Sequence, residues 1–170
     1  MQWVDRKRYL WLFGLIVPLF PFLGGALATL TGIGVFWYIG PILILGLVPL
    51  LDLLAGLDRS NPPDDVIAAL EADKYYRWIT YLFLPLQYAA LVWACWLWSG
   101  DSLSVSDKIG LALTIGIVAG IGINTAHELG HKKEKVERWL AKIALAQPFY
   151  GHFYIEHNRG HHVRVATPED

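Results

Sequence analysis

The sequence predicts an all-α integral-membrane protein with about four transmembrane helices. Of its 170 residues, 55% are hydrophobic and 17% are charged, whereas a soluble domain of this size carries more charge on its surface. The charged residues are also unevenly distributed, which leaves uncharged stretches at residues 9–51, 78–100 and 109–126. About 20 apolar residues in a helix cross roughly 30 Å of hydrocarbon. The first stretch is therefore long enough for two crossings, and each of the others for one.

The first uncharged stretch predicts two spans, at about 9–31 and 34–57, separated by a turn at Thr31-Gly32. Its basic start, apolar middle and small residues at 26–28 also resemble a secretory signal peptide. We favour a retained span, because further spans follow at once.

The other two stretches predict spans at about 78–99 and 107–127. Ser104 and Asp107 have capping-box spacing and would start the last of these helices. In the loop between the second and third spans, Asn61 is expected to cap a helix that begins at Pro62. We expect residues 1–170 to form a single integral-membrane domain.

The basic residues predict the orientation in the membrane. Thirteen of the 14 Lys and Arg residues lie on one side of the predicted bilayer, and only Lys108 lies on the other. The thirteen are Arg6, Lys7, Arg8, Arg59, Lys74, Arg77, Lys132, Lys133, Lys135, Arg138, Lys142, Arg159 and Arg164. Because basic residues are enriched in cytoplasmic loops, we expect a multi-pass inner (plasma) membrane protein with its N-terminus in the cytoplasm. The formal net charge of −1 gives no indication of nucleic-acid binding.

One acidic residue, Asp52, lies late in the second span among leucines. A carboxylate inside a membrane is costly unless it is paired, so a functional role as an outer-sphere partner of a metal site is one interpretation. The other is that Asp52 lies at the membrane surface and is solvated. The sequence favours neither.

All six histidines follow residue 126, on the predicted cytoplasmic side. His127 and His131 are four residues apart, and so are His157 and His161, with His162 adjacent. Residues at i and i+4 project from one face of a helix, so both imidazoles can reach one metal ion. Two such clusters predict a metal site. His152 does not have this spacing and is expected to be structural or an outer-sphere partner.

The identity of the metal is less constrained. His127-Glu128-Leu129-Gly130-His131 matches the H-E-x-x-H pattern of zinc proteases, in which Glu128 would be the general base. That interpretation leaves the second cluster unused, and five imidazoles exceed the ligands of one four-coordinate zinc. Two metal ions account for more of the histidines, although imidazole suits iron, zinc and copper alike.

Several longer motifs resemble one known family. HELGHKKEKVERW at 127–139 and GHFYIEHNRGHHVRVATPED at 151–170 resemble the first two histidine boxes of the membrane alkane 1-monooxygenases. NPPDDV at 61–66 and KYYRWITYLFLP at 74–85 extend the resemblance over most of the chain. VATPED after the histidine pair is more specific to the family than the histidine spacing, which fatty-acid desaturases share.

The resemblance implies a non-haem di-iron monooxygenase. It would use O2 and electrons from a rubredoxin-type donor to hydroxylate the terminal methyl of a medium-chain alkane, with membrane lipid around it. The implied iron ligands are His127, His131, His157, His161 and His162. Glu128 and Glu156 would orient imidazoles through hydrogen bonds.

The alternatives are another membrane di-iron oxidase acting on an aromatic methyl or an acyl chain, an intramembrane zinc protease, and a non-catalytic metal-binding fragment. The family pattern has further histidines and two more spans, so we expect this chain to be the N-terminal part of a six-helix fold and to be inactive alone.

Overall fold

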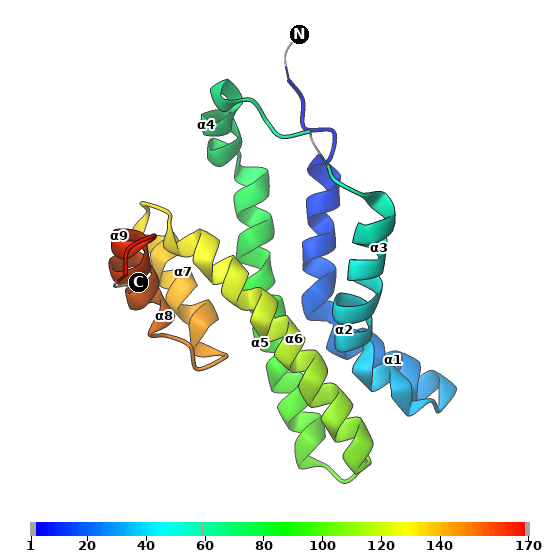
Figure 1. Cartoon of the computed structure of the whole chain (residues 1–170). Helices are drawn as coiled ribbons and strands as arrows, with labels where there is room; N and C mark the ends of the chain where they lie inside the picture. Colours follow the sequence, from blue (N-terminus) through cyan, green and yellow to red (C-terminus); the bar gives the residue numbers. More distant parts are fainter. Residues whose placement is uncertain (1–2, 59, 169–170) are drawn as a thin grey trace. The chain divides into compact units, whose positions relative to one another are not determined.

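The computed structural model describes residues 3–58 and 60–168, and within this part of the chain it contains helices and no strand (Figure 1). Arg59 and the final Glu169-Asp170 of the VATPED motif lie outside the described residues. The chain forms two compact units, one up to Val118 and the other from Ala119 onward.

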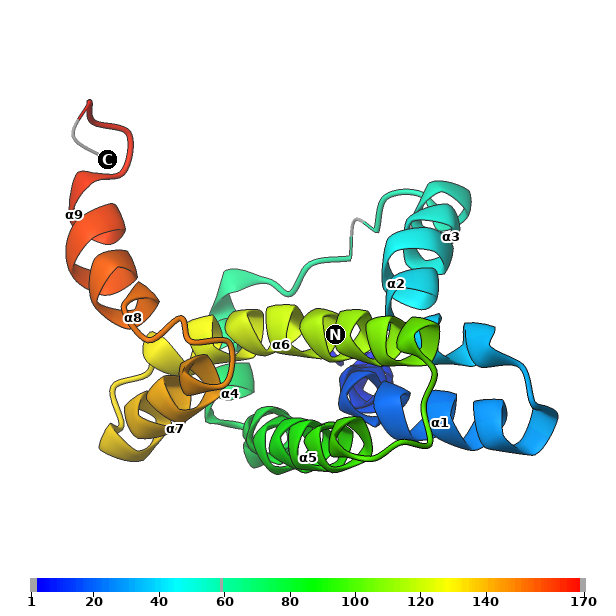
Figure 2. The same cartoon turned by 90° about the horizontal axis from the view of Figure 1, so that it is seen from below.

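Among the described residues, four helical segments are long and apolar enough to cross a membrane, which confirms the predicted fold class (Figures 1 and 2). The first consists of η1 (Arg8–Leu19) and α1 (Phe20–Thr31), and the second of η2 (Gly34–Tyr38), α2 (Ile39–Pro41), η3 (Ile42–Leu47) and α3 (Val48–Ala55). The third is α5 (Lys74–Ser99) and the fourth is α6 (Val105–Gly130). η1 and η2 are 3₁₀ helices and η3 is a π-helix, so the first two spans are less regular than the last two.

Local signals in the sequence set most of the helix ends. Gly32 ends α1 in the left-handed region, at φ 71°, where glycine is favoured. The Ser104 hydroxyl accepts from Asp107 N at 3.1 Å, and Asp107 Oδ2 accepts from Ser104 N at 3.2 Å, which confirms the capping box. The predicted start at Asn61-Pro62 is wrong, because α4 (Asp64–Ala72) begins after Pro63. A residue before proline is disfavoured in the α conformation, so two successive prolines delay the helix.

A side chain on a neighbouring helix satisfies the backbone carbonyl that Pro41 leaves without its helical hydrogen bond in the second span. Proline has no N–H, so the carbonyl of Trp37, four residues earlier, cannot make its helical hydrogen bond. The buried Thr114 hydroxyl on α6 donates to this carbonyl at 2.7 Å and accepts from Gly40 N at 3.1 Å. A Cβ on Gly40 would lie 2.8 Å from Thr114 Cα, so glycine permits this approach.

Replacing Thr114 with valine is therefore expected to destabilise the fold. Valine has the same shape but leaves the Trp37 carbonyl and the Gly40 amide unsatisfied in a buried site, which costs about 1–3 kcal/mol for each such group. Thr114→Ser keeps the hydroxyl and should lose much less. Thermal unfolding in detergent micelles measures both variants, and equal losses would mean that packing, not the hydroxyl, matters at this position.

A polar network joins the start of η1 to the start of α5. The Arg8 guanidinium donates to both carboxylate oxygens of Asp73, at 2.5 and 3.3 Å, and the Tyr75 hydroxyl donates to the Arg8 carbonyl at 3.0 Å. Asp73 also accepts from Tyr75 N at 2.8 Å and so caps α5. The Arg8 guanidinium lowers the pKa of the Asp73 carboxyl below its usual range. This cap explains why α5 begins at Lys74, four residues before the predicted span.

The Asp52 side chain is exposed on α3, and among the described residues it has no hydrogen-bond or ion-pair partner. Leu50, Leu51, Leu53 and Leu54 around it are more than half exposed, as expected for a surface in contact with lipid. A role for Asp52 at a metal site stays a prediction.

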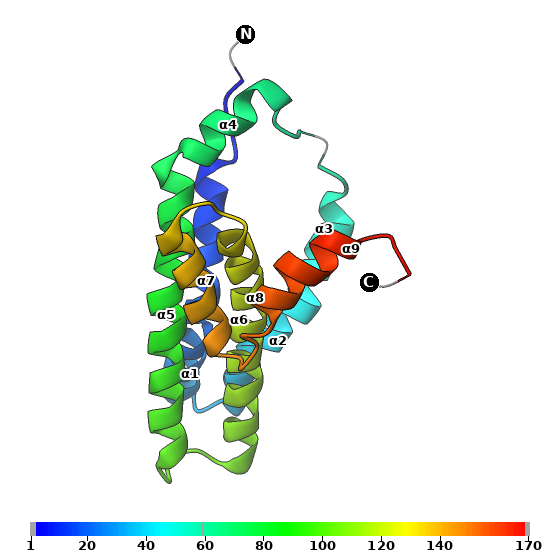
Figure 3. The ribbon, with the colours of Figure 1, turned by 90° about the vertical axis from the view of Figure 1, so that its left-hand side faces the viewer.

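The second unit contains the end of α6 and the helices after it. These are α7 (Lys135–Ala146), α8 (Phe153–Glu156), the π-helix η4 (His157–His161) and α9 (His162–Arg164) (Figure 3). α8, η4 and α9 follow one another without a break, so Phe153 to Arg164 form one continuous helical segment. This segment carries the second group of histidines.

Candidate metal centre

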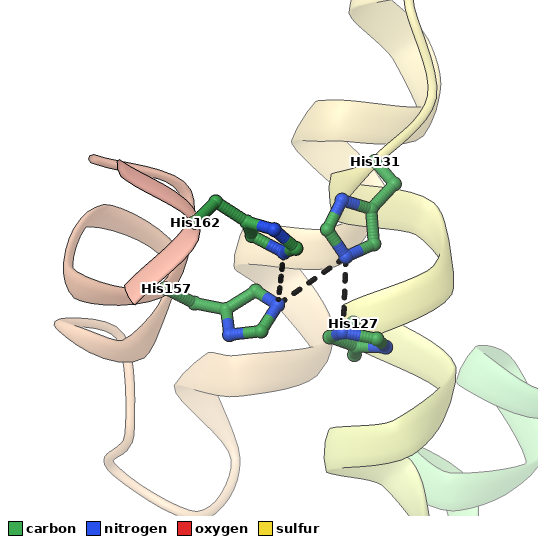
Figure 4. Close-up of side chains that lie close together, drawn as sticks. All are labelled: His127, His131, His157 and His162. Atoms are coloured by element: carbon green, nitrogen blue, oxygen red, sulfur yellow. Dashed lines mark hydrogen bonds between the residues drawn. The ribbon is translucent and has the colours of Figure 1, made fainter. Parts of the chain in front are cut away.

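Four of the five predicted ligands lie together in the second unit. His127 is in the last turn of α6, and His131 is the first residue after it, where its N–H donates to the His127 carbonyl at 3.3 Å and continues the helical turn. His157 begins η4 and His162 begins α9. The ligand atoms of these four residues, which we call the histidine cluster, all lie within 4.8 Å of one another. Figure 4 shows the four rings pointing toward one another.

The Nε2 atoms of the histidine cluster form a chain of close contacts. The distance is 2.9 Å between His127 and His131, 3.2 Å between His131 and His157, and 2.9 Å between His157 and His162 (Figure 4). A ring nitrogen carries either one proton or one lone pair. The two middle nitrogens, those of His131 and His157, therefore cannot make two full hydrogen bonds each. A cation among the four nitrogens would use every lone pair, so the donor set fits a metal ion.

The environment favours the neutral form of the two middle imidazoles. Burial lowers the pKa of His131 and of His157, and the nearby His127 and His162 imidazoles lower both further. Neutral imidazole is the form that binds metal. These two side chains therefore keep a lone pair for a metal at a lower pH than a solvent-exposed histidine does.

Glu128 lies on the outer side of the cluster. Its Oε1 is 3.4 Å from His127 Nδ1, and the carboxylate is largely exposed. A carboxylate at Nδ1 favours the tautomer with a proton there, which leaves the His127 Nε2 lone pair facing the other histidines. Among the described residues the cluster contains imidazoles alone. In this position Glu128 is better placed to orient the His127 imidazole than to act as a general base at the metal.

The other predicted residues lie outside the cluster. The His161 ring stacks on that of His157, with centroids 5.5 Å apart, but His161 is not among the four with converging ligand atoms. His152 packs against Tyr150, with centroids 4.6 Å apart. Glu156 is exposed, and its side chain has no hydrogen-bond or ion-pair partner among the described residues.

Two supporting aromatic residues were not predicted from the sequence. The Phe153 ring stacks on the His157 ring, at 4.8 Å and 17°. A Cβ on Gly130 would lie 3.6 Å from the Tyr154 ring, at ordinary van der Waals distance, so the Tyr154 ring packs against the end of α6. The i, i+4 spacing of Phe153 and His157 was the available signal, because residues so spaced share a helix face.

Comparison with known proteins points to the same part of the chain. The fatty acid desaturase family model matches residues 108–170, which include all six histidines. Over 170 residues the chain is 51% identical to alkane 1-monooxygenase 1 of Alcanivorax borkumensis, covering 99% of this chain and 42% of that protein. It is 48% identical to an alkane 1-monooxygenase of Pseudomonas putida and 43% identical to one of Acinetobacter baylyi, with 99% and 100% of this chain aligned and 42% of each relative.

The chain thus spans about two fifths of the length of the curated relatives it matches. The aligned part extends through the four membrane-length helices and the histidine cluster. Over its whole length, the chain is therefore homologous to part of the alkane 1-monooxygenases.

Proposed function

We propose that this chain is part of a non-haem di-iron monooxygenase that hydroxylates the terminal methyl of a medium-chain alkane with O2. The observation that carries the proposal is the convergence of four imidazoles, within 4.8 Å, in a chain about half identical to alkane 1-monooxygenases. Imidazole ligands suit iron, as they also suit zinc and copper.

His127, His131, His157 and His162 would hold metal, and His161 adds a fifth imidazole one helical turn from His157. An oxygen-activating iron keeps open positions beside a small set of protein ligands, so five imidazoles suit two iron ions better than one, and we propose two. When bound, iron supplies the O2 activation and electron transfer that protein side chains cannot. Glu128 would keep His127 in the tautomer that binds metal.

The substrate would be recognised by apolar burial alone, because an alkane has no polar group. Burial of each CH2 contributes about 0.8 kcal/mol. The exposed leucines of the second span would lie in the lipid hydrocarbon, in which alkanes dissolve. We propose that substrate enters from the bilayer and that a rubredoxin-type protein delivers electrons from the aqueous side.

An intramembrane zinc protease is the second candidate, because residues 127–131 match H-E-x-x-H. A general base must reach a metal-bound water, yet Glu128 lies at the Nδ1 side of His127, away from the converging Nε2 atoms. This geometry favours the oxidase.

The test is octane turnover by the chain extended to the length of its relatives, with O2, a rubredoxin and its reductase. We expect 1-octanol, together with about two iron ions per protein after anaerobic purification. Protein that retains one zinc and no iron, and that cleaves peptides, would overturn the proposal. The same preparation with His157→Ala is the control for background oxidation.

We also propose an inner-membrane location with the N-terminus and the histidine cluster in the cytoplasm, because thirteen of 14 basic residues share that side. The measurement is labelling of introduced cysteines in intact cells, in a Cys95→Ala background. Ser102→Cys should react with an impermeant reagent and Asn158→Cys should not. Equal reactivity of the two would overturn the orientation.

A further inference from the structure

The helix between the two pairs of clustered histidines, α7, has an apolar stripe that the second unit leaves uncovered. Glu137, Ala141, Ala144 and Leu145 form its buried face. Val136, Trp139 and Ile143, which we call the apolar stripe, are 65%, 64% and 45% exposed. Their i, i+3, i+7 spacing places them on one side of the helix. A water-soluble surface rarely aligns large apolar side chains in this way.

A basic stripe lies beside the apolar one. Lys135, Arg138 and Lys142 are exposed and have the same i, i+3, i+7 spacing. At about 100° per residue, the centres of the two stripes are roughly 100° apart around the helix. The Lys142 ammonium lies 4.7 Å from the centre of the Trp139 ring, so its stem covers apolar surface. The outward half of α7 is therefore divided into an apolar side and a cationic side.

The chain connectivity keeps α7 close to the membrane. α7 begins five residues after the last residue of α6, and five residues of extended chain span at most about 18 Å. Within the second unit, α7 turns back beside the end of α6 and does not continue away from it (Figures 1 and 3). The apolar stripe consequently stays near the depth at which the fourth span leaves the hydrocarbon.

We propose that α7 is an interfacial helix that binds an anionic phospholipid surface, with the apolar stripe among the acyl chains and the basic stripe among the phosphates. Tryptophan, aliphatic side chains and flanking lysines are the composition of helices that lie in the membrane interface. An acidic protein partner would use the basic stripe but would leave Val136 and Ile143 without a role. Because α7 connects His131 to the segment that carries His157, its anchoring fixes the depth of the histidine cluster.

The test uses single-cysteine variants of the chain in a Cys95→Ala background, spin-labelled and reconstituted in nanodiscs of anionic phospholipid. Val136→Cys and Ile143→Cys report on the apolar stripe, and Lys133→Cys, in the exposed link before α7, is the matched control. We expect the ratio of oxygen to water-soluble nickel-complex accessibility to be several-fold higher for the two stripe labels. If the stripe labels were as accessible to the nickel complex as the control label, the proposal would be overturned, and the apolar stripe would instead be a binding surface for a protein partner.

A second comparison tests the charge. Lys135→Gln combined with Lys142→Gln should bring the Ile143 label closer to water in anionic nanodiscs, with less change in zwitterionic ones. The same measurement with the Val136 label guards against a local distortion at either label position. Depth that depends neither on lipid charge nor on these lysines would overturn the role of the basic stripe.

Discussion

Replacing His157 with alanine is expected to remove most of the metal affinity of the histidine cluster. His157 Nε2 is 3.2 Å from that of His131 and 2.9 Å from that of His162, so it links the two groups of histidines. Loss of an outer-sphere partner typically lowers metal affinity 10–100-fold, and loss of this central ligand should cost more. Calorimetric titration with Fe(II) under anaerobic conditions measures the change.

His161→Ala is the matched control, because His161 is in the same helical turn but outside the four converging side chains. We expect it to retain Fe(II) binding much better than His157→Ala. An equal loss would mean that the i, i+4 pair His157 and His161 holds the metal, as the spacing alone suggests. His152→Ala, whose ring packs on Tyr150, should leave the affinity unchanged.

Removing the Glu128 carboxylate is expected to have the next largest effect. Glu128→Ala takes away the carboxylate that lies 3.4 Å from His127 Nδ1, so the imidazole loses its preferred tautomer and the Fe(II) affinity should fall 10–100-fold. Glu128→Gln keeps an oxygen that can accept the same proton, and most of the affinity should remain. The pair of variants therefore separates orientation from proton transfer.

Opposite results would identify a general base. If the carboxylate moved protons at the metal, as in a zinc protease, Glu128→Gln would lose turnover as completely as Glu128→Ala while keeping the metal. Glu156→Ala is the comparison for a carboxylate with no hydrogen-bond or ion-pair partner among the described residues, and a smaller loss of Fe(II) affinity is expected there.

Much of the architecture could be predicted from the sequence, because membrane helices depend on local composition. Long uncharged stretches must be helical in hydrocarbon, where every backbone polar group has to be satisfied within the chain. The turn at Gly32 and the cap at Ser104 are equally local, since each depends on residues within one helical turn. The start of α4 was mispredicted where two successive prolines opposed a good cap.

By itself the sequence determined the four membrane-length helices and the pool of histidines, because hydropathy and i, i+4 spacing are properties of neighbouring residues. Tertiary structure alone decided that His131 meets His157 and His162, and that the Thr114 hydroxyl satisfies the Trp37 carbonyl. Those contacts join residues 26, 31 and 77 positions apart, and their distances depend on how helices pack. The choice of His162 over His161 has the same cause: both follow His157 closely, and the continuous turn from η4 into α9 aims only the His162 ring at the cluster.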